Sequence, residues 1–214
     1  MKSAVERLVR IQSETVWMEG MLAVPAGAQG VVLFAHGSGS GRFSPRNQFV
    51  AGRLREEGVG TLLIDLLTPQ ESDDRIKVFD IGLLASRLLS ATDWLRDEET
   101  TRDLAIGYFG ASTGAAAALR AAAAHPEIGA VVSRGGRPDL AMEYLPAVKA
   151  PTLLIVGGHD IPVIPLNQQA YELLGGQKEI VIVPGATHLF EEPGTLEKVA
   201  QLAAEWFARY LAPD

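Results

Sequence analysis

The chain has no cysteine among its 214 residues. Disulfides, zinc–thiolate sites, iron–sulfur clusters and a cysteine nucleophile are therefore all excluded. It also has no block of five or six basic residues, and its formal net charge is -7, so we expect neither nucleic acid nor a membrane as a partner. No apolar run approaches the roughly 18 residues that span a bilayer, and the start, MKSAVERLVRIQSETV, lacks the apolar core of a signal peptide. We expect a cytoplasmic protein.

Hydrophobic residues make up 47% of the chain, which suits a sizeable core in a single domain spanning residues 1–214. Short β-branched apolar runs alternate with segments of helical period. Near-continuous apolarity predicts strands that are buried on both faces of a mostly parallel sheet. The expected strands are 31–37, 60–65, 104–110, 129–136, 152–158 and 179–185, and the expected helices are 45–57, 77–97, 113–124, 163–175 and 195–211.

This alternation predicts an α/β fold with a doubly wound sheet flanked by helices. The segment ETVWMEGMLAVP (14–25) alternates like antiparallel edge strands, with Glu19–Gly20 as the expected turn. Only about 15 residues separate AVVSRGG from the next strand, too few for a helical lid, so we expect no cap domain and an open site. Ligands of such sheets bind beyond the carboxyl ends of the strands, and polar residues there are the candidates for chemistry.

The stretch GASTG (110–114) matches G-x-S-x-G, in which a serine occupies a sharp strand-to-helix turn and the glycines relieve crowding. A serine needs a base and a group that orients the base. Asp160 in GGHD and His188 in GATHLF follow later strands, in the expected chain order. We predict Ser112 as nucleophile, His188 as general base and Asp160 as the group that orients it. The alternatives are a helix cap for Ser112, a turn or cap aspartate, and a structural loop histidine.

The loop HGSGSGR (36–42) follows the first long buried strand, and its glycines would let backbone N–H groups approach a developing oxyanion. We predict that the N–H groups of Ser38 and Thr113 form an oxyanion hole. The alternative is a flexible Gly/Ser loop. Neither of the glycine-rich phosphate-binding patterns can be read from this loop.

Arginines follow two of the expected strands: Arg42 and Arg46 after the glycine-rich loop, and Arg134 and Arg137 in SRGGRPD. Arginine forms bidentate pairs with anions, so we predict that Arg42 and Arg134 bind a negative group of the substrate. The alternative is pairing with structural acids, for which the candidates are Asp65, Asp139 and Glu143.

Taken in order, HGSGSG, GASTG, GGHD and GATHLF resemble the α/β-hydrolase superfamily, most closely its small cap-less members of the dienelactone hydrolase type, over residues 20–211. Dienelactone hydrolases proper use a cysteine nucleophile, whereas Ser112 stands in that place here. The resemblance therefore implies a serine hydrolase of small carboxylic esters that works through an acyl-enzyme intermediate, without a metal or cofactor. Peptidase, amidase or thioesterase activity on the same triad stays open, as does a non-catalytic binding module with the hydrolase fold. A homodimer is also open.

Overall fold

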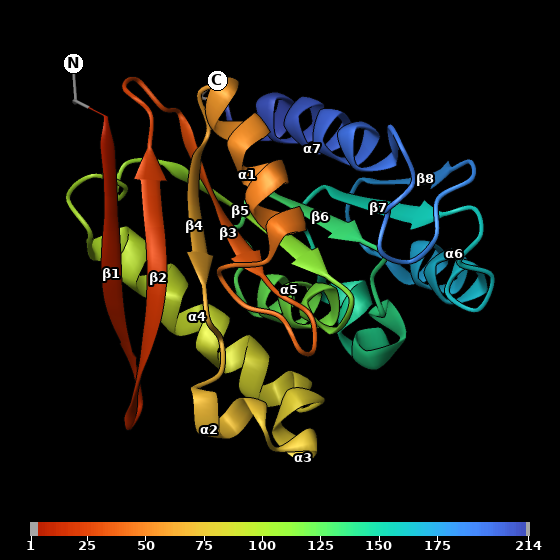
Figure 1. Ribbon diagram of the computed structural model, residues 1–214, viewed down its shortest axis with the longest axis horizontal. Helices are drawn as coiled ribbons and strands as arrows, with labels where there is room; N and C mark the ends of the chain where they lie inside the picture. The colour runs from red at the N-terminus through yellow and green to blue at the C-terminus, as the bar shows by residue number, and fades with distance from the viewer. Residues whose placement is uncertain (1–3, 213–214) are drawn as a thin grey trace.

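All six apolar runs predicted as strands become strands of one eight-stranded sheet (Figure 1). The computed structural model describes residues 4–212. The order across the sheet is β1-β2-β4-β3-β5-β6-β7-β8, and all pairings from β4 to β8 are parallel. The strands are β1 Val5–Ser13, β2 Val16–Val24, β3 Gly30–Ala35, β4 Gly60–Ile64, β5 Ala105–Ala111, β6 Ala130–Arg134, β7 Thr152–Gly157 and β8 Lys178–Val183. The mostly parallel sheet predicted from the sequence is confirmed.

The N-terminal hairpin confirms the antiparallel edge but not the predicted turn. Strands β1 and β2 pair from Val5–Val24 to Ser13–Val16, so the turn lies at Glu14, which takes a positive φ of 52°. Gly20 is instead inside β2, opposite Val9. A Cβ on Gly20 would lie 3.0 Å from Leu62 Cδ1, so this glycine serves close packing against the neighbouring strand rather than a reversal of the chain.

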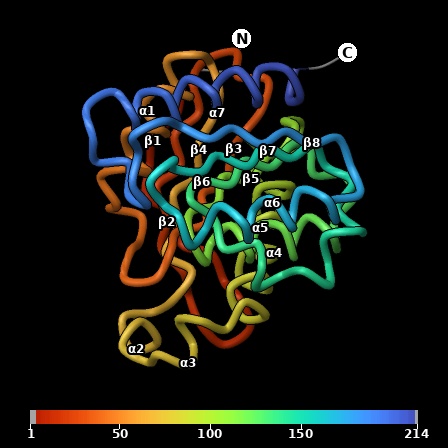
Figure 2. Tube along the Cα trace, turned by 90° about the vertical axis from the view of Figure 1, so that its right-hand side faces the viewer, coloured from red at the N-terminus to blue at the C-terminus, as the bar shows by residue number. Residues whose placement is uncertain are grey.

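Helices cover both faces of the sheet and produce three layers (Figure 2). Helices α1 and α7 lie on one face, and α4, α5 and α6 on the other, because apolar side chains alternate along the buried strands. In β3, for example, Leu33 joins the core under α4 and α5, whereas Val32 and Phe34 join the core under α1 and α7. The helices are α1 Pro45–Glu56, α2 Pro69–Ser72, α3 Arg75–Val78, α4 Ile81–Asp97, α5 Thr113–Ala124, η1 Pro138–Ala147, α6 Ile164–Leu173 and α7 Thr195–Leu211.

The helix predicted over 77–97 begins later than expected. The side chain of Asp80 accepts a hydrogen bond of 2.9 Å from Leu83 N and so caps α4, while the residues before it form the separate short helices α2 and α3. The segment after β6 forms η1, which packs against α5 and α6. Within residues 4–212 no helical domain caps the sheet. In that same range no helix combines the length and the apolar character that a membrane crossing requires.

Candidate active site

Ser112 lies at the junction of β5 and α5 in a conformation that few residues adopt. Its φ of 52° and ψ of -122° are the mirror image of an extended conformation, which favours glycine. The residue is at the N-cap position of α5, yet its side chain makes no capping hydrogen bond. The hydroxyl of Ser112 is therefore not used to satisfy the helix, and the backbone strain has to be held by the surroundings.

Two glycines and two strands hold this turn. A Cβ on Gly114 would lie 2.1 Å from the carbonyl oxygen of Ala35, and one on Gly110 would lie 2.4 Å from Ala115 Cα, so neither position tolerates a side chain. Ser112 N donates to Arg134 O over 3.3 Å, and Arg137 N donates to Ser112 O over 3.1 Å. The turn is thus tied on both sides to β6 and the loop that follows it.

His188 and Asp160 are joined directly by a hydrogen bond of 2.6 Å between Nδ1 and Oδ2. Asp160 follows β7 and is 8% exposed, whereas the side chain of His188 follows β8 and is 37% exposed. A carboxylate at Nδ1 fixes the imidazole with its proton on that nitrogen and leaves Nε2 free to accept a proton. The structure thereby brings together two of the three residues that the sequence singled out.

The loop that carries His188 is held by Glu192, a residue that the sequence analysis missed. Thr187 donates to Glu192 through its backbone N, over 3.0 Å, and through its hydroxyl, over 2.7 Å. These hydrogen bonds lower the pKa of the Glu192 carboxyl. The signal in the sequence is the five-residue separation of Thr187 and Glu192 across a turn, which is too common a pattern to single out by itself.

Ser112 and His188 line the same cavity, which has a volume of about 560 Å³ and lies beyond the carboxyl ends of β3, β5, β6 and β8. Among the described residues, no hydrogen bond joins the Ser112 hydroxyl to His188. Ser38 lines the cavity too, and Thr113 is the first residue of α5. The backbone N–H groups of these two residues donate to no acceptor within residues 4–212. The cavity wall also includes Phe43, Arg46, Asn47 and Leu189.

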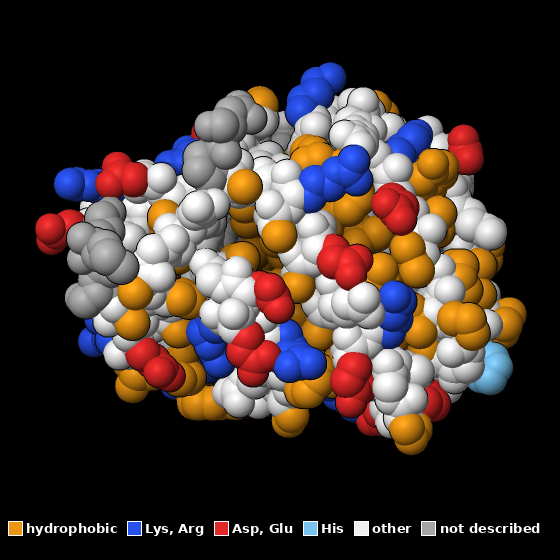
Figure 3. All heavy atoms as spheres, turned by 90° about the horizontal axis from the view of Figure 1, so that it is seen from above, with side chains coloured by type: hydrophobic (Ala, Val, Ile, Leu, Met, Phe, Trp, Pro, Cys, Tyr) orange, Lys and Arg blue, Asp and Glu red, His pale blue; other side chains and the backbone are white. Residues whose placement is uncertain are grey.

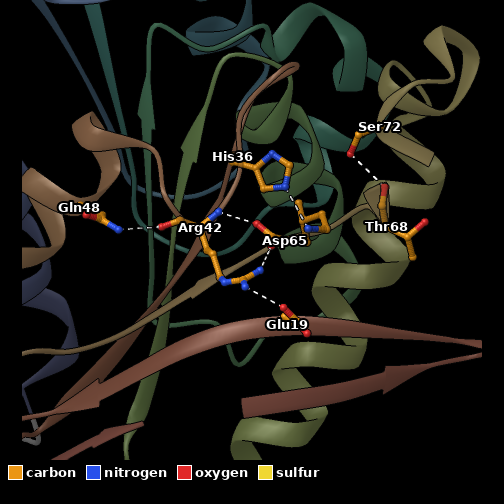
Figure 4. A network of polar contacts seen from close by, with 8 residues as sticks. Glu19, His36, Arg42, Gln48, Asp65, Thr68 and Ser72 are labelled. Atoms are coloured by element: carbon orange, nitrogen blue, oxygen red, sulfur yellow. Dashed lines mark hydrogen bonds and ion pairs between the residues drawn. The ribbon is translucent and has the colours of Figure 1, made fainter. Parts of the chain in front are cut away.

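His36 fixes the start of the glycine-rich loop (Figure 4). Its Nε2 accepts a hydrogen bond of 2.9 Å from Leu66 N, and its Nδ1 lies 3.0 Å from the carbonyl oxygen of Gly37, so a neutral ring with the proton on Nδ1 satisfies both contacts. Burial lowers the pKa of His36 from its ordinary value of 6.5, against the opposing effects of the Gly37 hydrogen bond and the Asp65 charge. His36 is thus a structural residue of the loop.

The prediction for Arg42 has to be corrected. Its guanidinium pairs with Asp65 and, over 2.7 Å, with Glu19, and its backbone N donates to Asp65 over 2.6 Å (Figure 4). Arg42 does not line the cavity. Its charge is paired with two carboxylates, so it holds the glycine-rich loop against β2 and β4. This is the alternative of pairing with structural acids, with Asp65 as one of the acids named.

The remaining arginines divide in the same way. Arg137 pairs with Asp139 over 2.8 Å, in a bidentate contact outside the cavity. Arg134, in contrast, lines the cavity, together with Arg46, which the sequence analysis noted but did not assign to the site. The binding of a substrate anion by Arg134 stays a prediction. Arg46 could have been found because Ser44 and Pro45 mark a helix start directly after the glycine-rich loop, which puts its side chain at the carboxyl edge of the sheet.

A mostly parallel sheet with helices on both faces and a strained serine between β5 and α5 defines an α/β-hydrolase fold. Residues 18–211 match the dienelactone hydrolase family, and the chain belongs to that family. The crystal structure of a dienelactone hydrolase from Anabaena variabilis is 59% identical, covers 98% of this chain and all of its own, and has a TM-score of 0.94. Est1E from Butyrivibrio proteoclasticus covers 96% of this chain and 99% of its own, with a TM-score of 0.83 at 16% identity, a likeness of fold alone.

Two Mycobacterium tuberculosis proteins, provisionally named phosphoribosyl transferases, are 57% identical over 205 residues, which is 95% of this chain. The chain spans 46% of their length, so about half of each relative has no counterpart here.

Proposed function

We propose that this protein hydrolyses small carboxylic esters with Ser112 as nucleophile, His188 as general base and Asp160 as the residue that orients His188. The observation that carries the proposal is the 2.6 Å hydrogen bond between His188 and Asp160, at the edge of a cavity that Ser112 also lines. The Ser112 hydroxyl makes no capping hydrogen bond to α5. The match to a family of hydrolases supports the same reaction class.

The proposed reaction has two halves. Ser112 Oγ attacks the ester carbonyl carbon while His188 Nε2 accepts its proton, and His188 then delivers that proton to the departing alkoxide, leaving an acyl-enzyme. Water, deprotonated by His188, attacks the acyl carbonyl and releases the carboxylic acid and free Ser112. The carboxylate of Asp160 stabilises the imidazolium formed in each half.

The oxyanion of each tetrahedral intermediate would bind the backbone N–H groups of Ser38 and Thr113. Support comes from the lack of any acceptor for these two groups within residues 4–212, from Ser38 and Ser112 lining the same cavity, and from Thr113 following Ser112 directly as the first residue of α5. The N-terminus of α5 adds a favourable partial charge, since the first N–H groups of a helix have no partner within it. Because the groups are fixed before substrate binds, they need little reorganisation during reaction.

The transferase name of the Mycobacterium tuberculosis relatives describes proteins more than twice the length of the matching region. The residues of this chain support hydrolysis, because Ser112 lines the same cavity as His188, which is hydrogen-bonded to Asp160. Amidase, peptidase or thioesterase activity would use the same residues, and a panel of matched esters, thioesters and amides distinguishes them. We expect the esters to be turned over with the highest kcat/KM.

The proposal is tested with a fluorophosphonate probe and mass mapping of the modified residue. We expect the wild-type protein to be labelled on Ser112, and Ser112→Ala to lose labelling together with at least about 10³-fold of ester kcat/KM. Ser90→Ala is the control, since the Ser90 hydroxyl donates to Ser86 O within α4 and lies outside the cavity.

If the wild-type protein is not labelled by the probe and hydrolyses no ester, the hydrolase proposal is wrong. A non-catalytic binding module would then be the remaining hypothesis. Labelling that persists in Ser112→Ala would assign the nucleophile elsewhere.

A further inference from the structure

The guanidinium of Arg134 is buried next to Ser112 without a partner. Arg134 is the last residue of β6, opposite Ala111 of β5, and it is 7% exposed. Within residues 4–212 its side chain makes no hydrogen bond and no ion pair, and its Nε is buried without a hydrogen-bond partner. The Arg134 guanidinium faces the ring of Phe190, whose centroid lies 5.9 Å from Cζ. Burying an unpaired charge costs free energy, and an anion bound to the guanidinium would offset that cost.

A second cation faces the same cavity. Arg46, in the first turn of α1, lines the wall together with Arg134, and among residues 4–212 no Asp or Glu side chain does so. Burial, together with the charge of Arg46, lowers the pKa of Arg134 to about 10, which still leaves the guanidinium charged at neutral pH. Arg46 also pairs with Glu191, whose side chain is 62% exposed. The cavity wall is therefore positive, although the whole chain carries a net charge of -7.

The N-terminus of α1 points into this positive region. Ser44, Pro45 and Asn47 all line the cavity, and α1 is 12 residues long, so its first turn presents a partial positive charge. Pro45 has no N–H and Asn47 N already donates to Ser44 Oγ over 3.4 Å, so the N–H of Arg46 is the first-turn donor without an acceptor among residues 4–212. Helix N-termini bind phosphate through this charge and through their free N–H groups.

From these contacts we propose that the cavity holds the phosphate monoester group of a phosphorylated ester substrate, bound between Arg134, Arg46 and the N-terminus of α1, with its ester carbonyl at Ser112. This inference rests on the proposed ester hydrolysis and names its substrate class. Arg134 supplies planar donors from within the wall, and Arg46 closes over the anion from the rim.

A phosphate matches this arrangement better than a carboxylate does. It carries about -1.5 to -2 charges at neutral pH and three acceptor oxygens, enough to meet two guanidinium groups and a helix end together. A single carboxylate carries one charge and two acceptor oxygens, so it can meet Arg134 but leaves Arg46 with Glu191 as its partner. Glu191 provides little competition for Arg46, since exposed ion pairs contribute little.

The experiment compares three acetate esters of equal chain length, whose far end carries a phosphate monoester, a carboxylate or a methoxy group. We expect wild-type kcat/KM to rank them in that order. The ratio of phosphate to methoxy ester should fall at least about 30-fold in Arg134→Met, the size typical of truncating one partner of a buried charge contact. Arg134→Lys should recover part of the ratio because it retains the charge.

Matched substitutions in α1 keep the test independent of the folding of Arg134→Met. Arg46→Gln removes a cavity cation and should lower the ratio, whereas Arg53→Gln, in the same helix and paired with exposed Glu56, should retain the wild-type ratio. An equal or higher kcat/KM for the carboxylate ester would overturn the proposal. So would a ratio that Arg134→Met and Arg46→Gln both leave unchanged.

Calorimetric titration of Ser112→Ala with phenyl phosphate, and with benzoate as the comparator, separates this inference from the hydrolysis itself. We expect phenyl phosphate to bind more tightly than benzoate, and Arg134→Met in that background to lose the difference. Phosphate binding without turnover of any ester would sink the hydrolase proposal and retain the site. Ester turnover with no preference for phenyl phosphate would do the reverse.

Discussion

His36 illustrates how one buried side chain can hold a loop in only one protonation state. Its Nε2 accepts from Leu66 N, and its Nδ1 proton is directed at Gly37 O, so a second proton would destroy the contact with Leu66. The glycine-rich loop that begins here contributes Ser38, whose backbone N–H is one of the two proposed oxyanion donors. The charge state of His36 is therefore coupled to the geometry of that loop.

The lowered pKa of His36 gives a signed prediction for stability. The unfolded chain takes up the proton near pH 6.5, before the folded chain does, so the contribution of His36 is complete above that pH and is lost as pH falls below it. Urea unfolding at pH 7.5 and pH 5 should show this loss in the wild type. His36→Gln should be less stable at pH 7.5 and lose less on acidification, whereas His125→Gln, at the end of α5, should retain the wild-type loss. An identical pH dependence in His36→Gln would contradict the assignment.

The sequence and the structure agree unevenly at this scale. Ser112, Asp160 and His188 could be singled out because a local motif and a fixed chain order point to them, and their roles stay predictions. Asp65 was among the structural acids considered as alternative partners of the arginines, and Arg42 pairs with it. The second partner, Glu19, could not be foreseen, because it comes from β2 and only the folded sheet brings it to Arg42. Arg134 and Arg42 look alike in the sequence, yet Arg42 pairs with two carboxylates, whereas Arg134 pairs with none among residues 4–212.

Among the elements, prediction succeeded where the pattern is long. Apolar runs predict the buried strands, and helical periodicity predicts the five longer helices. Helices α2 and α3 have four residues each, too few to produce a periodic pattern. The hairpin turn at Glu14 was missed because it contains no glycine, proline or asparagine, while the conspicuous Gly20 serves packing inside a strand.

Close contact between α5 and the end of β3 predicts which glycine can be replaced. Gly114→Ala would put a methyl group against the backbone of Ala35 and His36, so we expect a loss of at least about 2 kcal/mol in the free energy of unfolding. Gly52→Ala, in α1, meets nothing closer than 3.8 Å and should gain about 0.5–1 kcal/mol from reduced entropy of the unfolded chain. Urea unfolding measures both. Equal effects of the two substitutions would show that α5 can move away from β3.

In the whole molecule, the sheet separates two hydrophobic cores, and its strands contribute side chains to each of them. One core lies under α4 and α5, and the other under α1 and α7, and the central strands contribute side chains to both. Each helical layer buries its apolar side chains in a core that the sheet completes. The two cores should therefore form and melt together.

Substitutions on opposite faces of the sheet test this coupling. Leu88→Ala in α4 and Leu54→Ala in α1 each truncate a fully buried side chain, and each should cost about 2–5 kcal/mol. Circular dichroism and tryptophan fluorescence should follow one coincident urea transition in the wild type and in both variants. Two separate transitions in either variant would mean that the faces unfold independently.

The direction of the strands also determines how the molecule can be attached to other things. Val5 pairs with Val24 beside the amino ends of the parallel strands, and Leu211 lies against Gly30 and Gly129, at that same edge of the sheet. In Figure 1 both ends of the chain are at the top, and the outer surface seen from that side in Figure 3 mixes acidic and basic side chains. The cavity opens at the opposite edge. A bead, an affinity tag or a second protein joined at either end would leave the mouth of the cavity facing away from the join, so immobilised protein should remain open to substrate.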